Sequence, residues 1–361
     1  MKKLKKDEAL PGVSYTCQCF LRKGGFIIME NNAMIKGVAY YHPENVVDNE
    51  YFIEHFKKQG KDIEGLLRAT GRKSRYISTD EKENMLTMGY QASLKVLEQT
   101  HVKVAQINLI VFSSGTPEYI APTNALKLHS MLNAGQKCAV YDLNANCAGM
   151  VVALDQVARL MKSNLDIKYA LLVGSDQLNR YVRYNEVVPY SNFADSACAM
   201  VIENVFSTKR GFIDSDFYTN SSNHDKILLP AKGMSTVTRD RNLPTEDKLV
   251  KWIPFDFGGA FHSAKISIEE LLFKNGLQKD DIKKYYFSQL ALKNIVLASE
   301  DLEEDIEKFK FVGDEFGYTG TTSPMLAYAR SIEDKELQIG DYVVFWTVGA
   351  GTTCATVLYK Y

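Results

Sequence analysis

Short apolar runs alternate with amphipathic stretches along most of the chain, and this alternation predicts the fold class. The runs at 107–112 and 169–173 have the length and apolarity of buried strands. Residues 84–99 instead place their apolar side chains on one side of a helix. The second half repeats this alternation from residue 211 onward. Because strands that alternate with helices form sheets covered by helices, the pattern predicts an α/β protein.

The predicted elements follow from the same pattern. Strands are expected at 34–40, 107–112, 138–143, 169–173, 198–203, 211–218, 284–287, 341–348 and 353–359. Helices are expected at 84–99, 122–132, 147–161, 261–274, 290–299 and 323–331. The polar stretch 220–248 is predicted to be a loop excursion.

The first 33 residues stand outside this pattern. The string Lys23-Gly24-Gly25 lies a few codons before Met29. Such a string can be encoded by a purine-rich stretch that resembles a bacterial ribosome-binding site. One interpretation therefore starts the natural protein at Met29, with residues 1–28 as upstream sequence read in frame. The other is a short basic tail. In both cases residues 1–33 are treated as an N-terminal extension.

Composition narrows the class of protein. The chain has 361 residues, a net charge of −1 and 45% apolar residues. This balance is ordinary for a globular domain and leaves no basic excess for binding nucleic acid. No apolar run is long enough to span a membrane, and no secretory signal is apparent, so a cytoplasmic protein with reduced thiols is expected. The Cys17-x-Cys19 pair has no further ligands nearby, so no metal site is predicted.

Cys147 is the candidate nucleophile. It follows a short apolar strand and precedes an apolar helix, so it is expected in the first turn of that helix. Free backbone N–H groups and the helix dipole favour a thiolate at such a position. The small residues Ala148 and Gly149 leave room for a substrate to approach the sulfur. The alternative is a buried structural cysteine, the more common role of a free cysteine.

Several strings together resemble the β-ketoacyl-acyl-carrier-protein synthase III family of the thiolase-like superfamily. Asn144-Ala145-Asn146-Cys147-Ala148-Gly149 is similar to the family's nucleophile motif. Further landmarks follow the family's order, and the match covers roughly residues 34 to 361. These landmarks lie at 70–75, 173–176, 193–197, 316–323 and 348–351.

The resemblance implies a fold and an activity. The fold would be a duplicated thiolase-like fold, a five-layer αβαβα sandwich with halves at 34–205 and 206–361. The protein would form a homodimer, or a heterodimer with a homologue, through the strand before the cysteine. Cys147 would take an acyl group from acyl-coenzyme A or an acyl carrier protein, with no other cofactor.

Two positions depart from the family's Cys-His-Asn triad. Direct alignment puts Gln289 at the place of the histidine, and a slip of one residue puts Ser288 there. Tyr318 takes the place of the asparagine. Glutamine and tyrosine donate hydrogen bonds but do not supply a base at neutral pH. His262, at the start of a predicted helix, is a possible substitute base, although a surface histidine is the more usual finding.

Other positions carried over from the family concern binding. The backbone N–H groups of Cys147 and Ala350 would form the oxyanion hole. Ala121, before a proline, would leave the acyl pocket more room than the family's bulkier residue. Gly65 stands at the place of the aromatic residue that stacks on the adenine of coenzyme A. Lys73 and Arg75 are weak candidates for phosphate contacts.

The sequence therefore predicts an acyltransferase or condensing enzyme that resembles ketoacyl synthase III. Because two of the three triad positions depart, a role in secondary metabolism or specialised fatty-acid biosynthesis is favoured over housekeeping initiation. The alternative is a partner subunit with little or no activity, which binds a catalytic homologue or an acyl carrier protein.

Overall fold

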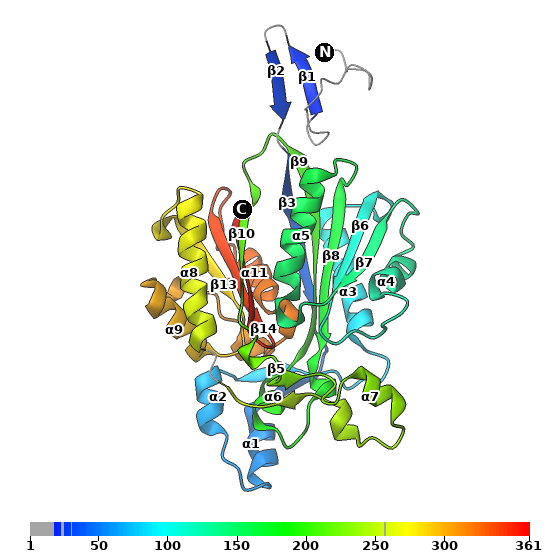
Figure 1. The fold of residues 1–361 in the computed structure, drawn as a ribbon, viewed down its shortest axis with the longest axis vertical. Coiled ribbons are helices and arrows are strands. Elements are labelled where there is room, and N and C mark those ends of the chain that lie inside the picture. Colours follow the sequence, from blue (N-terminus) through cyan, green and yellow to red (C-terminus); the bar gives the residue numbers. More distant parts are fainter. Residues whose placement is uncertain (1–17, 23–24, 30, 256–257) are drawn as a thin grey trace.

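Two large β-sheets lie side by side and share a layer of helices between them (Figure 1). The structure is a computed structural model that describes residues 18–22, 25–29, 31–255 and 258–361. A hairpin of β1 (Gln18–Arg22) and β2 (Gly25–Met29) precedes the body of the fold. Residues 1–17 of the predicted extension, with Cys17, lie outside the described residues.

The first sheet has five strands in the order β3-β9-β8-β6-β7. Their bounds are β3 Asn31–Tyr41, β9 Asp195–Phe206, β8 Tyr169–Gln177, β6 Ile107–Ser113 and β7 Ala139–Leu143. β9 runs antiparallel to both β3 and β8, whereas β6 runs parallel to β8 and β7. β7 is therefore an edge strand. β3 begins three residues before the predicted start at Met34.

The second sheet repeats the arrangement of the first four strands. Its order is β10-β15-β14-β13, with β10 Gly211–Thr219, β15 Thr353–Lys360, β14 Tyr342–Gly349 and β13 Ile282–Phe287. β15 is antiparallel to both neighbours, and β13 is parallel to β14. The same succession of strand directions in both sheets confirms the predicted duplication.

Helices complete five layers, as predicted. The middle layer is α5 (Gly149–Ser163) with α11 (Ser323–Glu333), and their buried faces share one core with both sheets. The outer face of the first sheet is covered by α3 (Met85–Thr100) and α4 (Asn124–Leu132). The outer face of the second is covered by α8 (Gly258–Lys274) and α9 (Leu292–Leu302). No helix in the described part of the chain has the length and apolarity to cross a membrane.

Several small elements below the sheets escaped prediction. They are α1 (Asn49–Lys57), α2 (Glu64–Thr70), α6 (Val187–Asn192) and the pair β4 (Val46–Asp48) and β5 (Ser74–Tyr76). The predicted excursion 220–248 also holds structure. It contains β11 (Ile227–Leu228) and α7 (Met234–Arg239), and β11 pairs with β12 (Lys251–Trp252) just beyond it. Two-residue strands are too short to leave a periodic signal in a sequence.

Candidate active site

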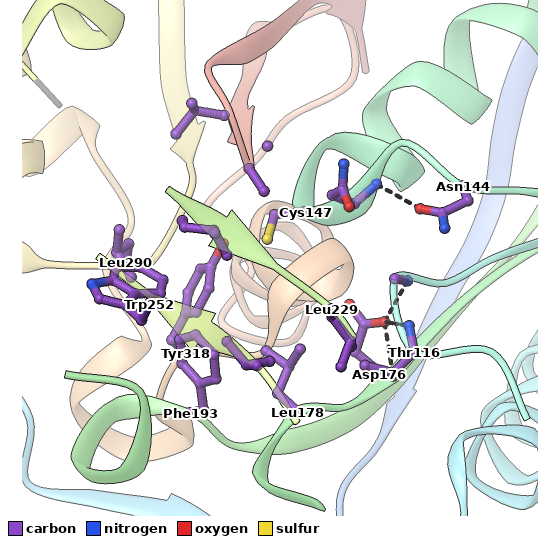
Figure 2. Close-up of a pocket in the computed structure, with 17 residues that line it drawn as sticks. Thr116, Asn144, Cys147, Asp176, Leu178, Phe193, Leu229, Trp252, Leu290 and Tyr318 are labelled. Atoms are coloured by element: carbon purple, nitrogen blue, oxygen red, sulfur yellow. Dashed lines mark hydrogen bonds between the residues drawn. The ribbon is translucent and has the colours of Figure 1, made fainter. Parts of the chain in front are cut away.

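Cys147 lies in a tight turn between β7 and α5. A 3₁₀ turn, Asn146–Ala148, carries the cysteine, and α5 begins at Gly149. Asn146 has φ 52°, a left-handed conformation that asparagine tolerates better than most residues. The predicted strand-to-helix junction is confirmed, with Cys147 in a turn just before the helix. Figure 2 shows its sulfur turned into a pocket.

Gly149 is required by packing, not by access to the sulfur. A Cβ atom at this position would collide with Ser113 Oγ at the end of β6 and with Thr321 Oγ1 from the second half. Met150 N donates a hydrogen bond to Thr321 Oγ1 at 2.9 Å. The start of α5 is thus pressed directly against the second half of the molecule. Thr347 Oγ1, on β14, adds a hydrogen bond to the carbonyl of Cys147 at 3.1 Å.

The pocket beside Cys147 measures about 130 Å³ and draws on both halves. A cavity of roughly 150 Å³ is large enough for one benzene ring, so this one suits a short acyl group or a small ring. One wall is apolar and comes largely from the excursion and its neighbours. These residues are Leu178, Phe193, Ile227, Leu229, Val250, Trp252 and Leu290.

Burial sets the protonation state of the nucleophile. It raises the pKa of the Cys147 thiol to about 12. A hydrogen bond from the Tyr318 hydroxyl lowers this pKa, and the nearby charge of Asp176 raises it. The backbone at the helix start lowers the pKa of the thiol, as the sequence predicted, but desolvation of this half-buried side chain outweighs that effect.

Tyr318 is brought to Cys147, as its place in the sequence predicted. Its backbone N–H donates to Asn192 O at 2.8 Å, and its carbonyl accepts from Ala194 N at 2.9 Å. These bonds and its ring contact with Phe193, at 5.6 Å between centroids, fix the side chain, and its ring lies in the pocket beside Cys147 (Figure 2). Burial raises the pKa of Tyr318 well above its usual range. The phenol is therefore a neutral hydrogen-bond donor.

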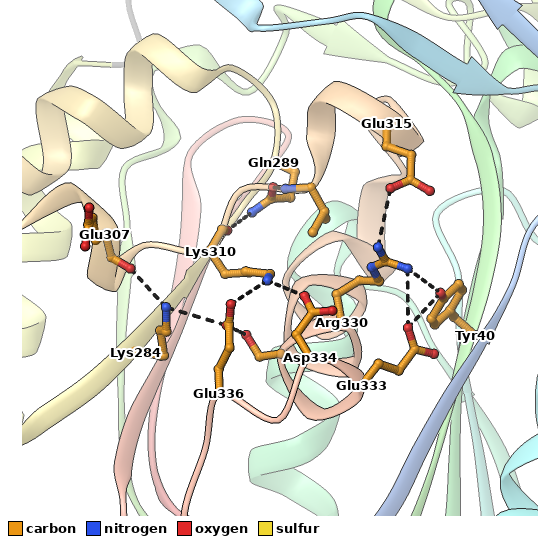
Figure 3. Close-up of polar contacts among 12 residues, drawn as sticks. Tyr40, Lys284, Gln289, Glu307, Lys310, Glu315, Arg330, Glu333, Asp334 and Glu336 are labelled. Carbon is orange, nitrogen blue, oxygen red and sulfur yellow. Dashed lines mark hydrogen bonds and ion pairs between the residues drawn. The ribbon is translucent and has the colours of Figure 1, made fainter.

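Gln289 is not brought to the thiol. Its Nε2 donates to Phe287 O at 2.7 Å and to Lys310 O at 3.1 Å. Its Oε1 accepts from the N–H groups of Val312 and Gly313 at 2.8 and 3.2 Å. Figure 3 shows the amide turned toward Lys310. All the amide's hydrogen-bonding capacity goes to the backbone, which gives Gln289 a structural position.

Ser288 faces Tyr318 instead. Its hydroxyl is close enough to the phenol to lower the pKa of Tyr318. Ser288 is 1% exposed, and its Oγ has no partner that meets hydrogen-bond geometry among the described residues. Of the two candidates, Ser288 therefore interacts with Tyr318, whereas Gln289 bonds to the backbone, and neither lines the pocket itself. A role for Ser288 at the place of the family's histidine stays a prediction.

Ala350 lines the pocket together with Gly349 and Cys147. It lies in the turn between β14 and β15, where Gly351 and Thr352 have φ of 78° and 67°. Ala350 itself is not in the left-handed region, so its methyl group is accommodated without strain. The placement is compatible with the predicted oxyanion hole, which stays a prediction.

Three other predicted residues lie away from the pocket. Ala121 is exposed, precedes a cis bond to Pro122, and does not line the pocket of its own chain. Lys73 is exposed and pairs with Asp314 at 2.9 Å. His262 projects from α8 and pairs with Asp301 at 3.4 Å, with 66% of its side chain exposed. His262 as a base facing the substrate is therefore a wrong prediction.

Arg75 is a structural residue, so its predicted phosphate contact is wrong. The side chain is completely buried. It donates to Asn49 Oδ1 at 2.8 Å and to Ser191 O, and its guanidinium lies 4.2 Å from the centroid of the Phe52 ring. Gly65, in contrast, has open space around the position of a Cβ atom, with only Arg68 Nη2 at 4.0 Å.

Asp176 is a site residue that sequence reasoning passed over. It stood in the landmark string 173–176 but was given no role. It lies at the carboxyl end of β8, is 1% exposed and lines the pocket. A carboxyl group at the end of a buried apolar strand was the available signal. The described residues contain no cluster of three or more His, Cys, Asp or Glu side chains suited to a metal ion.

A duplicated five-layer α/β sandwich, with a cysteine in the turn before a central helix, defines the thiolase-like class of enzymes. Sequence comparison then points to one family. Residues 141–221 match the family described as 3-oxoacyl-[acyl-carrier-protein (ACP)] synthase III, and residues 272–361 match its C-terminal domain. Both halves of the chain therefore resemble this family.

Individual relatives agree with this assignment. The chain is 28% identical over 328 residues to the β-ketoacyl-[acyl-carrier-protein] synthase III of Xanthomonas euvesicatoria, covering 91% of this chain and 98% of the relative. The Clostridium perfringens enzyme of the same name is 28% identical over 331 residues, 91% of this chain and 99% of the relative. The crystal structure of the Aquifex aeolicus 3-oxoacyl-[acyl-carrier-protein] synthase III matches with a TM-score of 0.80 at 22% identity, over 91% of this chain and all of that one.

Proposed function

We propose that this protein transfers an acyl group from an acyl thioester, through Cys147, to an acceptor other than a malonyl thioester. The observation that carries this proposal is the pocket itself. It combines a cysteine in a tight turn, a fixed hydroxyl donor from Tyr318 and backbone N–H groups at Cys147 and Ala350. Backbone donors aimed at a developing oxyanion stabilise acyl transfer most strongly.

The choice of acceptor follows from what lines the pocket. No imidazole is found among its described lining residues, and the residues near the thiol other than Asp176 are neutral at pH 7. Tyr318 and Ser288 can hold a carbonyl oxygen but supply no proton chemistry near neutrality. The family members named above are synthases, so loss of the histidine favours a divergent acyl transfer, as in specialised fatty-acid biosynthesis or secondary metabolism.

The donor is proposed to be an acyl carrier protein or acyl-coenzyme A. Glycine at position 65 supplies no ring for adenine to stack on, and Arg75 is buried. These two features favour a carrier protein over coenzyme A. The chemistry needs a reduced thiol, which fits a cytoplasmic location.

The proposed assembly is a dimer through β7. Within the described residues this strand pairs only with β6 and leaves its other edge open, with half-exposed side chains. Ile120 nearby is 75% exposed. An uncovered edge strand is a template for pairing with a second copy or a homologue, and that pairing would bring Ala121 toward the partner's pocket.

Intact-protein mass spectrometry tests the proposal. The protein is incubated with a panel of acyl carrier proteins and acyl-coenzyme A thioesters of increasing chain length. The expected result is the addition of one acyl mass, lost in Cys147→Ala and kept in Cys138→Ala, the matched control at a second free cysteine. If no donor acylates the wild type, the proposal fails and the partner-subunit alternative replaces it.

A further inference from the structure

The carboxylate of Asp176 is held asymmetrically. Its Oδ1 accepts hydrogen bonds from Ser114 Oγ at 3.0 Å, Gly115 N at 2.8 Å, and Thr116 N and Oγ1 at 3.2 and 3.3 Å. Its Oδ2 accepts from Thr321 N at 2.9 Å. Figure 2 shows the contact of Asp176 with Thr116. A carboxylate offers about four acceptor sites in all, so Oδ1 is saturated and Oδ2 keeps spare capacity.

Asp176 is also the one pocket-lining group, among the described residues, that titrates near neutrality. Burial raises its pKa to about 6, against the opposing effect of hydrogen bonds from Thr321, Gly115, Ser114 and Thr116. The thiol of Cys147 and the phenol of Tyr318 titrate far higher. A general base works best when its pKa lies near the working pH, and carboxyl groups reach that range through burial.

Other titratable groups face Asp176 from every side. Cys147 approaches from the turn before α5 and Tyr318 from the turn before α11, and the charge of Asp176 raises the pKa of both. Burial is the main cause of the raised pKa of Asp195 on β9 and of Tyr181 after β8, and the charge of Asp176 adds to both. Asp195 accepts from Ser78 N and Asn179 N, both at 2.9 Å, and does not line the pocket.

We propose that Oδ2 of Asp176 is the proton acceptor of the second half-reaction, and that the acyl acceptor is a small protic nucleophile, an alcohol or an amine. This inference rests on the proposed function. A malonyl thioester becomes a nucleophile by losing carbon dioxide, so it presents no proton for a base to remove. An alcohol or amine must lose a proton as it attacks, and Asp176 is the group placed to take it.

The step balances within the site. The oxygen or nitrogen of the acceptor forms a bond to the thioester carbonyl carbon of the acylated Cys147, and its proton moves to Asp176 Oδ2. The negative charge on the carbonyl oxygen is held by backbone N–H groups. The carbon–sulfur bond then breaks, its electron pair stays on Sγ, and the proton returns from Asp176 to the sulfur. The products are the ester or amide and the free thiol.

A single-turnover experiment tests this role in the full-length protein. The acyl-enzyme is formed first, and its decay is then followed by mass spectrometry between pH 5 and 8, with ethanol or water alone as the acceptor. The decay rate is expected to rise through about pH 6 and then level off. Asp176→Asn should slow it by about 100-fold or more and remove this pH dependence. Asp195 is a second buried carboxyl group that titrates in a similar pH range. Asp195→Asn should therefore keep the wild-type decay rate and its pH dependence.

A second readout separates catalysis from structure. Because the charge of Asp176 raises the pKa of Cys147, Asp176→Asn should speed the alkylation of Cys147 by iodoacetamide while it slows acyl transfer. A role confined to packing would also speed alkylation by exposing the thiol, but it would leave the pH dependence of acyl transfer in place. If Asp176→Asn slows both alkylation and acyl transfer, or if it keeps the pH dependence of acyl transfer, Asp176 has only a structural role and the inference is wrong.

Milder variants keep the test decisive if Asp176→Asn does not fold. Ser114→Ala and Thr116→Val each remove a side-chain donor that lowers the pKa of Asp176. Each should move the rise in the transfer rate to higher pH, and an unchanged profile in both variants contradicts the inference. If the wild type never forms an acyl-enzyme, it is the proposed function that fails, which is a different result from an acyl-enzyme whose decay ignores Asp176.

Discussion

The two halves share an architecture but contribute different chemistry to one pocket. In each half a central antiparallel strand is flanked by an antiparallel edge strand and by a pair of parallel strands. The first half supplies the charged or nucleophilic groups, Cys147 and Asp176. The second supplies an uncharged hydrogen-bond donor, Tyr318, with Ser288 next to its phenol, and the turn with Ala350.

The comparison teaches that duplication separates two tasks. The nucleophile and the proton acceptor sit on the half that also has the fifth strand, β7, and α5. The groups that would hold the substrate carbonyl sit on turns of the other half, where they can change without disturbing the nucleophile. The departures from the Cys-His-Asn triad occur only in the second half, which fits a change of acceptor with the acylation step retained.

The largest expected effect comes from rebuilding the second half. Ser288→His with Tyr318→Asn introduces an imidazole next to position 318 and an amide at that position, the pair that the resemblance to the family implies. Decarboxylation of a malonyl carrier protein, measured as released radiolabelled carbon dioxide, should rise by about 100-fold or more. Gln289→His with Tyr318→Asn is the matched control and should give no gain. An equal gain from the control would contradict the placement of Ser288.

Ser288 and Gln289 also show where sequence reasoning stops. The strands, the core helices and the junction at Cys147 followed from apolar spacing, because burial imposes a period on the sequence. Apolar spacing does not determine which of two adjacent residues after β13 faces Tyr318, since a shift of one residue reverses the side. The same limit applies to Lys73 and Arg75.

Arg72 joins the two halves, and its loss should have the next largest effect. It is 3% exposed and donates to Asn192 Oδ1 at 3.2 Å in the first half. In the second half it donates to the carbonyls of Gln289 and Leu290 at 2.7 and 2.8 Å. Arg72→Leu should lower the free energy of unfolding by about 3 kcal/mol, because several buried acceptors lose their donor.

Chemical denaturation measures this effect. Lys73→Ala, at the adjacent and exposed position, should leave the denaturation midpoint unchanged because surface ion pairs contribute little. An Arg72→Leu protein with the wild-type free energy of unfolding would show that the halves are held together by apolar packing alone.

Gln289 should matter to stability and not to the thiol. Gln289→Leu removes four hydrogen bonds to the backbone around Lys310 and Gly313 and should cost about 2 kcal/mol in unfolding free energy. The alkylation rate of Cys147 in the folded variant should stay at the wild-type value. Ser288→Ala should show little change in stability. Slower alkylation of Cys147 in Gln289→Leu would show that Gln289 acts in the site after all.

The smallest expected effect concerns the hydrogen bond from the Tyr318 hydroxyl, in the second half, to the sulfur of Cys147, in the first half. Tyr318→Phe removes the hydroxyl that lowers the pKa of Cys147. The thiolate fraction should fall, so alkylation at pH 9 should slow by up to about tenfold, which corresponds to one pKa unit. In the wild type the rate should keep rising with pH throughout the range 7–10, because the thiol titrates near 12. A plateau below pH 9 would contradict this account of the buried sulfur.

The central claim is that the first half still accepts an acyl group while the second no longer supports malonyl decarboxylation. One quenched-flow measurement tests both in the same sample. The protein is mixed with an acyl carrier donor and a radiolabelled malonyl carrier protein, and each aliquot is divided between peptide mass spectrometry and carbon dioxide counting. We predict an acyl group on Cys147 in most molecules with carbon dioxide release at the background rate. Rapid carbon dioxide release, or a Cys147 that stays free with every donor, would contradict the account.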